Sequence, residues 1–400
     1  MSSPYTGLRV LELAEDPAGE YTGKLLADAG ADVIKIEPPA GVASRHVGPY
    51  VEGRTGPESS LAYRWYNTSK RSVVLPTGAE CTELERLVGC ADIVLTDLPK
   101  ARSRALGLDA REAVDTHPAL IVLAITPFGL DGPWADYRAS DLIALALGGP
   151  LSSCGYDDHS IPPIRPGGNQ AYATAASFAQ TGLLLALLER GRTGTGQVVD
   201  VAVHSALAVS GELANPFWFY NRAVVKRQTC RHAQPSPTQP ALFQCADGRW
   251  VYFALILADQ KPWQALVDWM SEHGLAADLV EPEYSDFAHR QRHFAHVQEL
   301  VEVFFLLIDS ETAYHEGQAR GLPIGINRAP EELLDDEHLA ARGFFVDVVH
   351  GDGTIARHPG SPFRFSAFDL PGPRPSPMLG AHTDEALAEV AGSETTTTRQ

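Results

Sequence analysis

The chain has 400 residues, of which 44% are apolar, and its formal net charge is −18. This length suits a two-domain enzyme. The negative charge argues against nucleic acid as a partner, because nucleic-acid binding needs a basic surface. A small anionic ligand is compatible with it, provided that the ligand meets a local basic patch.

The N-terminus and the cysteines bear on location and on metal binding. The first residues, MSSPYTGLRVLEL, lack the basic start and apolar core of a secretion signal. We find no run of about 18 uncharged apolar residues, so we expect no membrane span. The five cysteines form no CxxC pair, so we expect neither a disulfide framework nor a metal site. These features predict a cytoplasmic protein.

The first third of the chain alternates between β-rich and helical runs. The predicted strands are LRVLEL (8–13), ADVIKIE (31–37), SVVLP (72–76), ADIVLTDL (91–98) and ALIVLAIT (119–126). Strands separated by helices of this length predict a parallel sheet and a doubly wound α/β fold of the Rossmann type. No GxGxxG follows the first strand, which disfavours a nicotinamide dinucleotide as ligand.

The rest of the chain begins with a long apolar helix, predicted for residues 173–190. Residues 226–242 are basic, aperiodic and rich in Pro and Gln, so we interpret them as a linker into a second domain. LFQCADGRWVYFALI (242–256) predicts a hairpin around Asp247-Gly248. Helices are expected from there to about residue 321, followed by a return to strands and helices.

Seven stretches, in order and over nearly the whole chain, resemble the family III CoA-transferases, the group of formyl-CoA transferase, carnitine CoA-transferase and 2-methylacyl-CoA racemase. They are LLADAGADVIKIEPP, NTSKRSVVLP, FGLDGPWADYRASDL, LLLALLERGRTGTGQVVDVAV, DGRWV, DDEHLAARGFF and PMLGAHTDEAL. The resemblance implies a large Rossmann-like domain built from both chain ends, a smaller α+β domain, and a dimer of interlocked rings. We divide the chain into 1–225 (large, CoA-binding domain), 226–325 (small domain with linkers) and 326–400 (return to the large domain).

The resemblance also implies a CoA thioester as substrate, with no tightly bound cofactor. NTSKRSVVLP resembles the stretch that lines the CoA nucleotide pocket, which makes Lys70, Arg71 and Ser72 candidate CoA ligands. Lys70 and Arg71 stand at a strand entrance, where Arg and Lys can meet phosphate. The alternative is a solvated pair beside an edge strand.

A second candidate CoA contact follows the strand ADIVLT. The family carries an Asn-Phe-Arg-Pro-Gly turn there, and this chain has Asp97, Leu98, Pro99, Lys100 and Ala101 instead. The loop stays basic through Lys100, Arg102 and Arg104, so these cations and Asp97 are further candidate ligands. A helix with exposed cations is the alternative.

RPGGNQAYATAASFAQTG (165–182) covers the family's catalytic position. Counted back from Gly182, Tyr172 stands where the family keeps an Asp. That Asp attacks the thioester, forms a mixed anhydride and then carries CoA as an enzyme thioester. A phenol has no carbonyl carbon to carry CoA, so this route is closed at Tyr172.

Three interpretations of Tyr172 follow, besides that of a buried aromatic. It fills the position while a nearby acid reacts, the candidates being Asp141, Asp157 and Asp158. Alternatively, its hydroxyl donates a hydrogen bond to the thioester oxygen, as in an oxyanion hole. Or the chain is a catalytically silent, CoA-binding subunit beside an Asp-bearing paralogue.

We therefore predict an enzyme that transfers CoA between carboxylic acids as a homodimer, or as a heteromer with a paralogue. The candidate catalytic residues are Tyr172, Asp141, Asn169 and Gln170. The two amides either cap a helix, which is their commoner use, or orient a thioester carbonyl. An acyl-CoA racemase or isomerase is a further alternative, although the racemase His falls at Ser140, a poor base.

Overall fold

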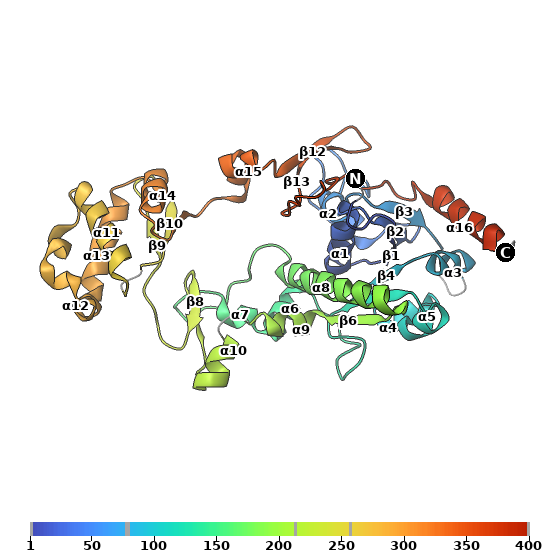
Figure 1. Cartoon of the computed structure of the whole chain (residues 1–400), viewed down its shortest axis with the longest axis horizontal. Coiled ribbons are helices and arrows are strands. Elements are labelled where there is room, and N and C mark those ends of the chain that lie inside the picture. The colour runs from blue at the N-terminus through green and yellow to red at the C-terminus, as the bar shows by residue number, and fades with distance from the viewer. Residues whose placement is uncertain (1–2, 77–80, 212–213, 256–257, 398–400) are drawn as a thin grey trace. The chain divides into compact units, whose positions relative to one another are not determined.

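The structure is a computed structural model that describes residues 3–76, 81–211, 214–255 and 258–397 (Figure 1). Its chain forms two compact units. The large unit comprises Met1–Pro150, Arg165–Gly211 and Glu337–Gln400, and the small unit comprises Leu151–Ile164 and Glu212–Asp336.

A six-stranded sheet forms the centre of the large unit. Its strands are β1 (Arg9–Leu13), β2 (Asp32–Glu37), β3 (Arg71–Val74), β4 (Ile93–Thr96), β5 (Ile121–Thr126) and β6 (Val198–Ala202). All neighbouring pairs are parallel, in the order β3-β2-β1-β4-β5-β6, which confirms the predicted α/β sheet. The strand order reverses between β1 and β4. In such sheets ligands bind outside the carboxyl ends of the strands at this reversal.

Helices cover both faces of this sheet. Helices α1 and α8 pack together on one face, and α3, α5 and α16 enclose an apolar core on the other (Figure 1). The remaining segments form short helices, loops and a hairpin. The bounds of these elements are α1 (Pro17–Asp28), η1 (Ala43–His46), α2 (Leu61–Tyr66), α3 (Thr82–Gly89), α4 (Lys100–Ala105), α5 (Ala110–Thr116), α6 (Asp141–Gly148), α8 (Gln170–Thr193), α9 (Val203–Val209), α15 (Glu337–Ala341), β12 (Phe345–Val349), β13 (Ile355–Pro359) and α16 (Thr383–Thr397).

The C-terminal segment returns to the N-terminal part of the large unit. Strands β12 and β13 pair antiparallel, and Asp352 in their turn is ion-paired with Arg54 and with Arg64, the latter at 2.5 Å. His358 of β13 stacks on Trp65 of α2, with ring centroids 6.2 Å apart. Helix α16 packs against α3 and β3. Both ends of the chain therefore build this unit.

A buried cluster of charged side chains joins β1, β2 and α1 to the entrance of β3. Lys35 Nζ lies 2.8 Å from Glu12 Oε1 and 3.0 Å from Glu20 Oε1, and Lys70 Nζ lies 2.7 Å from Glu12 Oε2. Lys35 Nζ also donates to the carbonyl of Ala14 at 2.8 Å. All four charged side chains are buried. Removing one partner would leave an unpaired buried charge, at a cost of about 3–5 kcal/mol, so the cluster fixes these elements relative to one another.

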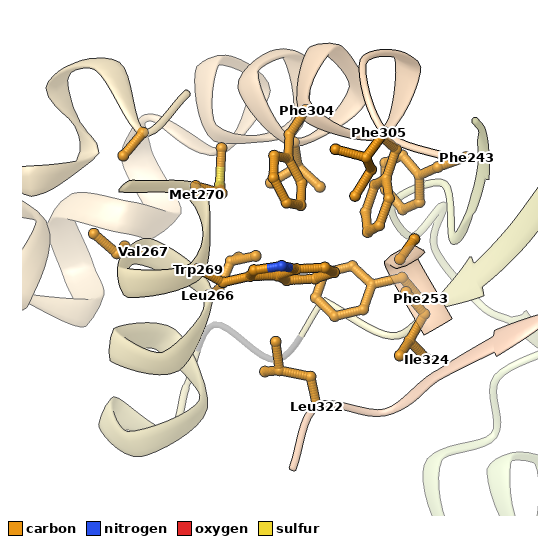
Figure 2. Packing of buried hydrophobic residues seen from close by; sticks show 14 of the residues in the cluster. Phe243, Phe253, Leu266, Val267, Trp269, Met270, Phe304, Phe305, Leu322 and Ile324 are labelled. Atoms are coloured by element: carbon orange, nitrogen blue, oxygen red, sulfur yellow. The ribbon is translucent and has the colours of Figure 1, made fainter. Parts of the chain in front are cut away.

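The small unit has its own core. Trp269 lies at its centre among Phe304, Phe305, Phe253 and Leu322 (Figure 2). The Trp269 and Phe304 rings meet edge to face, with centroids 4.7 Å apart. The elements of this unit are α7 (Pro150–Ser153), α10 (Ala214–Pro216), η2 (Phe217–Asn221), β7 (Lys226–Gln228), β8 (Arg231–Gln234), β9 (Leu242–Gln244), β10 (Trp250–Phe253), α11 (Gln260–Glu272), η3 (Ala277–Val280), η4 (Pro282–Ser285), α12 (Phe287–Arg292), α13 (Phe294–Leu306), α14 (Ser310–Ala319), β11 (Ile324–Ile326) and η5 (Pro330–Asp335).

Two sequence-based expectations for the small unit have different outcomes. The hairpin around Asp247-Gly248 is confirmed as the antiparallel pair β9–β10, although residue 256 lies outside the described residues. The interpretation of residues 226–242 as an aperiodic linker is wrong in part, because β7 and β8 pair antiparallel there. Gln228 stabilises this pair by accepting from the backbone N–H of Thr238 at 2.6 Å, a contact that periodicity does not reveal.

The unit boundaries also differ from the sequence-based division. The small unit spans Glu212–Asp336 rather than 226–325, and it also includes Leu151–Ile164. Residues 326–336 belong there because Asn327 N donates to Trp250 O at 2.9 Å and Glu332 is ion-paired with Arg249. Residues 151–164 belong there because Arg227 donates to carbonyls of that segment.

Gly23 of α1 tests the buried charged cluster. A Cβ at this position would lie 1.7 Å from Glu12 Oε2 and 3.1 Å from Lys70 Nζ, so it would separate the ion pair. We expect Gly23→Ala to lower the free energy of unfolding by at least about 3 kcal/mol, measured by urea unfolding. Gly191→Ala in α8 is the matched control, since no atom lies within 4 Å of its added Cβ. Equal effects of the two substitutions would contradict this account.

Candidate active site at the carboxyl edge of the large sheet

The first turn of α8 lies at the carboxyl edge of the sheet. The end of α8 lies at the opposite edge, because Arg190 Nη1 donates to the carbonyls of Asp92 and Ala119, just before β4 and β5, at 3.2 Å each. Helix α8 therefore runs in the same direction as its neighbour α1. Gln180 Nε2 joins the two helices by donating to Thr22 O at 3.0 Å. Tyr172 consequently lies at the edge where parallel sheets bind ligands.

Asp141 fixes the start of α8. Its Oδ1 accepts from the backbone N–H of Ala171 at 2.9 Å, and its Oδ2 accepts from Arg165 Nη2 at 2.8 Å. The side chain of Asp141 is buried. Asp141, the first residue of α6, thus takes the part of a capping residue for the neighbouring helix.

The capping role expected for Asn169 and Gln170 is therefore wrong. Asn169 occupies the N-cap position of α8, but its side chain makes no capping hydrogen bond. Its Nδ2 donates instead to the hydroxyl of Tyr66 at 2.9 Å, and Gln170 Nε2 donates to Gly167 O at 3.1 Å. The backbone N–H of Ala171, from which a capping side chain would accept a hydrogen bond, already donates to Asp141.

Tyr172 presents an unengaged, neutral phenol. Among the residues that the structure describes, its hydroxyl makes no hydrogen bond with the protein. Partial burial raises the pKa of Tyr172, and the carboxylates of Asp16, Asp141 and Asp97 raise it further. The hydroxyl therefore keeps its proton at neutral pH and can donate it in a hydrogen bond.

Asp97 and Asp16 follow the two strands at which the strand order reverses. Asp97, after β4, is buried and accepts from the backbone N–H of Asp16 at 2.8 Å and from that of Glu15 at 2.9 Å. Burial raises the pKa of Asp97 well above its usual range, and the charge of Asp16 acts in the same direction. Asp97 thus holds the loop after β1 rather than facing outward.

Three candidate cations lie on α4, at the same edge. Arg102 is ion-paired with Glu15, and Arg104 Nε lies 2.8 Å from Asp109 Oδ2. Within the described part of the chain, Lys100 has no ion pair. Arg102 and Glu15 line an open pocket, whose other lining residues are Leu13, Ile36, Glu37, Pro38, Leu75, Pro76, Cys81, Leu84, Leu98 and Leu106.

Lys70, Arg71 and Ser72 are engaged elsewhere. Lys70 belongs to the buried charged cluster, and burial lowers its pKa to about 8. Arg71 begins β3 at the amino edge and is ion-paired there with Asp32, Glu385 and Glu389. Ser72 Oγ donates to Glu37 Oε1 at 2.6 Å. The structure does not bring these three residues to Tyr172, and their contact with CoA stays a prediction.

The structure thus brings Tyr172, Asp141 and Asp97 to one edge of the sheet. Asp157 and Asp158 belong to the small unit, where Asp157 is ion-paired with Arg231 and Asp158 accepts from Ser160. Asp16 and Tyr66 also lie at this site and were not predicted from the sequence. Asp16 could have been found by asking which polar side chains directly follow β1 and β4, because carboxyl ends of parallel strands share one edge.

Metal-ligating clusters and long apolar helices are sparse among the described residues. In the described ranges, no group of three or more His, Cys, Asp or Glu side chains could hold a metal ion. One helix, α8, is long and apolar enough to span a membrane by length and composition. It packs against α1, α6, α9, β5 and β6, and 33% of its apolar window is buried within the protein.

Comparisons of sequence and of structure with known proteins point to the same family over nearly the whole chain. A family model described as CoA-transferase family III matches residues 5–383. The succinyl-CoA:(R)-benzylsuccinate CoA-transferase subunit BbsE of Thauera aromatica is 31% identical, over 97% of this chain and 95% of that protein. The succinate–glutarate CoA-transferase of Agrobacterium fabrum is also 31% identical, over 99% and 98%. A CaiB/BaiF family protein of Brucella suis matches in structure with a TM-score of 0.82 and 25% identity, over 98% of this chain and 100% of that one.

Asp141→Ala tests the anchoring of α8. The substitution leaves a buried backbone N–H and the Arg165 guanidinium without their acceptor, so we expect a loss of about 2–3 kcal/mol in the free energy of unfolding. Urea unfolding followed by circular dichroism measures it. The control is Arg192→Gln, which removes an exposed ion pair with Glu189 and should change stability by less than about 1 kcal/mol. An unchanged Asp141→Ala variant would show that α8 starts without this anchor.

Proposed function

Because this chain belongs to CoA-transferase family III, we propose that it moves CoA from an acyl-CoA donor to a second carboxylic acid, with Tyr172 in the catalytic centre. The observation that carries this proposal is the unengaged phenol of Tyr172 at the carboxyl edge of the sheet. A carboxylate stands there in the family, as the resemblance implies. Succinyl-CoA is the donor to test first, since relatives are named for succinyl-CoA and succinate.

Tyr172 acts in this proposal as a hydrogen-bond donor. Attack on a thioester places negative charge on its oxygen, and a donor aimed at that oxygen lowers the barrier. The raised pKa keeps the Tyr172 proton in place at neutral pH. Asp141 positions the first turn that carries the phenol, and Asn169 joins that turn to Tyr66. Gln170, in the same turn, orients the thioester in this proposal.

CoA binding is assigned to the pocket beside α4. Lys100, which has no ion pair among the described residues, and Arg102, which lines the pocket, are the proposed phosphate contacts. The ion pair of Arg102 with Glu15 is exposed, so it costs about 1 kcal/mol or less to replace. Arg104 extends the same basic surface, and Asp97 supports the loop behind it.

An apolar surface supports the proposed dimer. Helix α8 exposes Phe178, Leu184, Leu185 and Leu188 on one side, and neighbouring α6 exposes Leu147. Clusters of large exposed apolar side chains mark interaction sites in soluble proteins. We propose that a second copy of this chain covers this face, in the interlocked arrangement that the resemblance implies. A cytoplasmic location stays a prediction from the sequence.

A catalytically silent subunit is the second candidate function. It is favoured by two relatives that are named as subunits, and by the missing carboxylate at position 172. An exchange assay on the purified chain distinguishes a transferase from a silent subunit. A silent subunit binds acyl-CoA but exchanges no CoA unless a paralogue is added. A racemase is disfavoured, because the hydroxyl of Ser140 accepts from Ile143 N at 3.4 Å as the cap of α6.

Exchange of CoA by the purified chain tests the proposed function. We incubate it with succinyl-CoA and a panel of carboxylic acids and follow new acyl-CoA species by mass spectrometry. Tyr172→Phe should lower kcat by about 100-fold, because one oxyanion donor is lost. Tyr5→Phe, outside the site, should leave the rate unchanged. A Tyr172→Phe variant with the wild-type rate would remove the donor role.

The apolar face of α8 predicts the oligomeric state. Leu185 is 64% exposed, so Leu185→Glu should leave the folded chain intact while placing a charge in the proposed interface. We expect a dimer for the wild type and a monomer for Leu185→Glu by light scattering after size exclusion. Leu307→Glu, at a similarly exposed leucine of the small unit, is the matched control. A wild-type monomer would contradict the proposal.

A further inference from the structure

We propose that Asp16 is the carboxylate that carries CoA in this chain, in place of the acid missing at position 172. The inference rests on the proposed CoA-transferase function and names its nucleophile. It combines the place of Asp16 in the sheet, its position relative to Tyr172 and the engagement of the neighbouring carboxylates.

The place of Asp16 is set by the sheet topology. Asp16 lies between β1 and α1, and β1 is one of the two strands between which the strand order reverses. The loop is held by two contacts, one from Lys35 Nζ to Ala14 O and one from Asp16 N to Asp97 Oδ2, each at 2.8 Å. The side chain of Asp16 is thus presented from a fixed backbone at the edge where ligands bind.

Asp16 and Tyr172 lie at matching heights on two neighbouring helices. Helices α1 and α8 run in the same direction and are joined by the hydrogen bond from Gln180 to Thr22. Tyr172 precedes Gln180 by ~12 Å of helix rise and Asp16 precedes Thr22 by ~9 Å. Consistent with this placement, the charge of Asp16 acts more strongly on the Tyr172 phenol than that of any other carboxylate.

Three neighbouring carboxylates of this edge, Asp97, Asp141 and Glu15, are engaged by protein groups. Both oxygens of Asp97 accept backbone N–H groups, and both oxygens of Asp141 are taken by Ala171 and Arg165. Glu15 is ion-paired with Arg102. Asp16 occupies the N-cap position of α1 without a capping bond and is exposed. Among described residues its carboxylate has no hydrogen bond or ion pair, so it is available to a substrate.

The surroundings of Asp16 also suit a nucleophile. Desolvation by the surrounding protein raises the pKa of Asp16, and the charges of Glu15 and Glu20 raise it further. A more basic carboxylate is a better nucleophile once it is ionised. The Tyr172 hydroxyl then serves as the hydrogen-bond donor to the thioester oxygen.

Four balanced steps follow for Asp16. An Asp16 oxygen attacks the acyl carbon, the C–S bond breaks, and CoA leaves as thiolate from a mixed anhydride. The thiolate attacks the Asp16 carbonyl carbon and releases the donor acid, which leaves CoA on Asp16 as a thioester. The acceptor carboxylate attacks that carbonyl and expels the thiolate again. The thiolate finally attacks the acceptor carbonyl, giving the new acyl-CoA and the Asp16 carboxylate. No oxidant or reductant is needed.

Trapping the intermediate tests this assignment. Hydroxylamine added during turnover converts an aspartyl thioester or anhydride to the hydroxamate. We expect the hydroxamate on Asp16 in the tryptic peptide 10–24, located by fragmentation. Asp16→Asn should lower the rate of CoA exchange by on the order of 10³-fold or more, as expected for loss of a nucleophile. The affinity for succinyl-CoA, measured by calorimetry, should stay within about 3-fold of wild type, because no contact to Lys100 or Arg102 is removed. Asp115→Asn, an exposed acid on α5, is the control with unchanged exchange.

The outcomes separate the two proposals. Exchange by the wild type with the hydroxamate on another residue, or with full activity in Asp16→Asn, overturns the role of Asp16 and leaves the CoA-transferase function standing. Absence of exchange by the wild type with every acid of the panel overturns the proposed function and the role of Asp16 with it. Hydroxamate trapping on the wild-type protein identifies the nucleophile even if the Asp16→Asn variant fails to fold.

Discussion

The large unit depends on a buried set of charges between β1, β2 and α1. Lys35 bridges Glu12 and Glu20 and also donates to the carbonyl of Ala14. Charges withdrawn from water are tolerated only when they are paired and hydrogen-bonded, so these groups must keep their relative positions. The loop that follows β1 therefore leaves the sheet from a fixed point. The carboxylate of Asp97 fixes this loop a second time by accepting hydrogen bonds from the backbone N–H groups of Glu15 and Asp16.

The first turn of α8, at the same edge of the sheet, is also held in place by hydrogen bonds. Asp141 supplies the acceptor that the first turn of α8 lacks. This turn carries the Tyr172 phenol, whose pKa is raised by burial and by the surrounding negative charge, so that it keeps its proton. A phenol can polarise a thioester, but valence prevents it from carrying CoA. A carboxylate from a neighbouring element is thus the simplest way to keep a transferase reaction at this edge. Asp16 has no hydrogen bond or ion pair among the described residues, and its charge acts on the Tyr172 phenol.

The sequence predicts the strands and helices well where local patterns dominate. The parallel strands, the long helix α8 and the hairpin at Asp247-Gly248 follow from hydrophobic period and turn residues. Side-chain roles at the site are less predictable, because they depend on distant partners. Lys70 looked like a phosphate ligand, but its ammonium meets Glu12, 58 residues earlier in the chain. Asp16 was overlooked, since only the packing of α1 against α8 brings it to Tyr172.

The most direct test of the central claim follows oxygen atoms. An acceptor acid labelled with ¹⁸O in its carboxylate leaves one labelled oxygen on the enzyme carboxylate after each complete cycle, because the last thiolate attack cleaves the anhydride on the acceptor side. After turnover and digestion, the account predicts ¹⁸O in peptide 10–24, confined by fragmentation to Asp16. Label on another carboxylate, or none on the protein while labelled acid is converted to acyl-CoA, would contradict it.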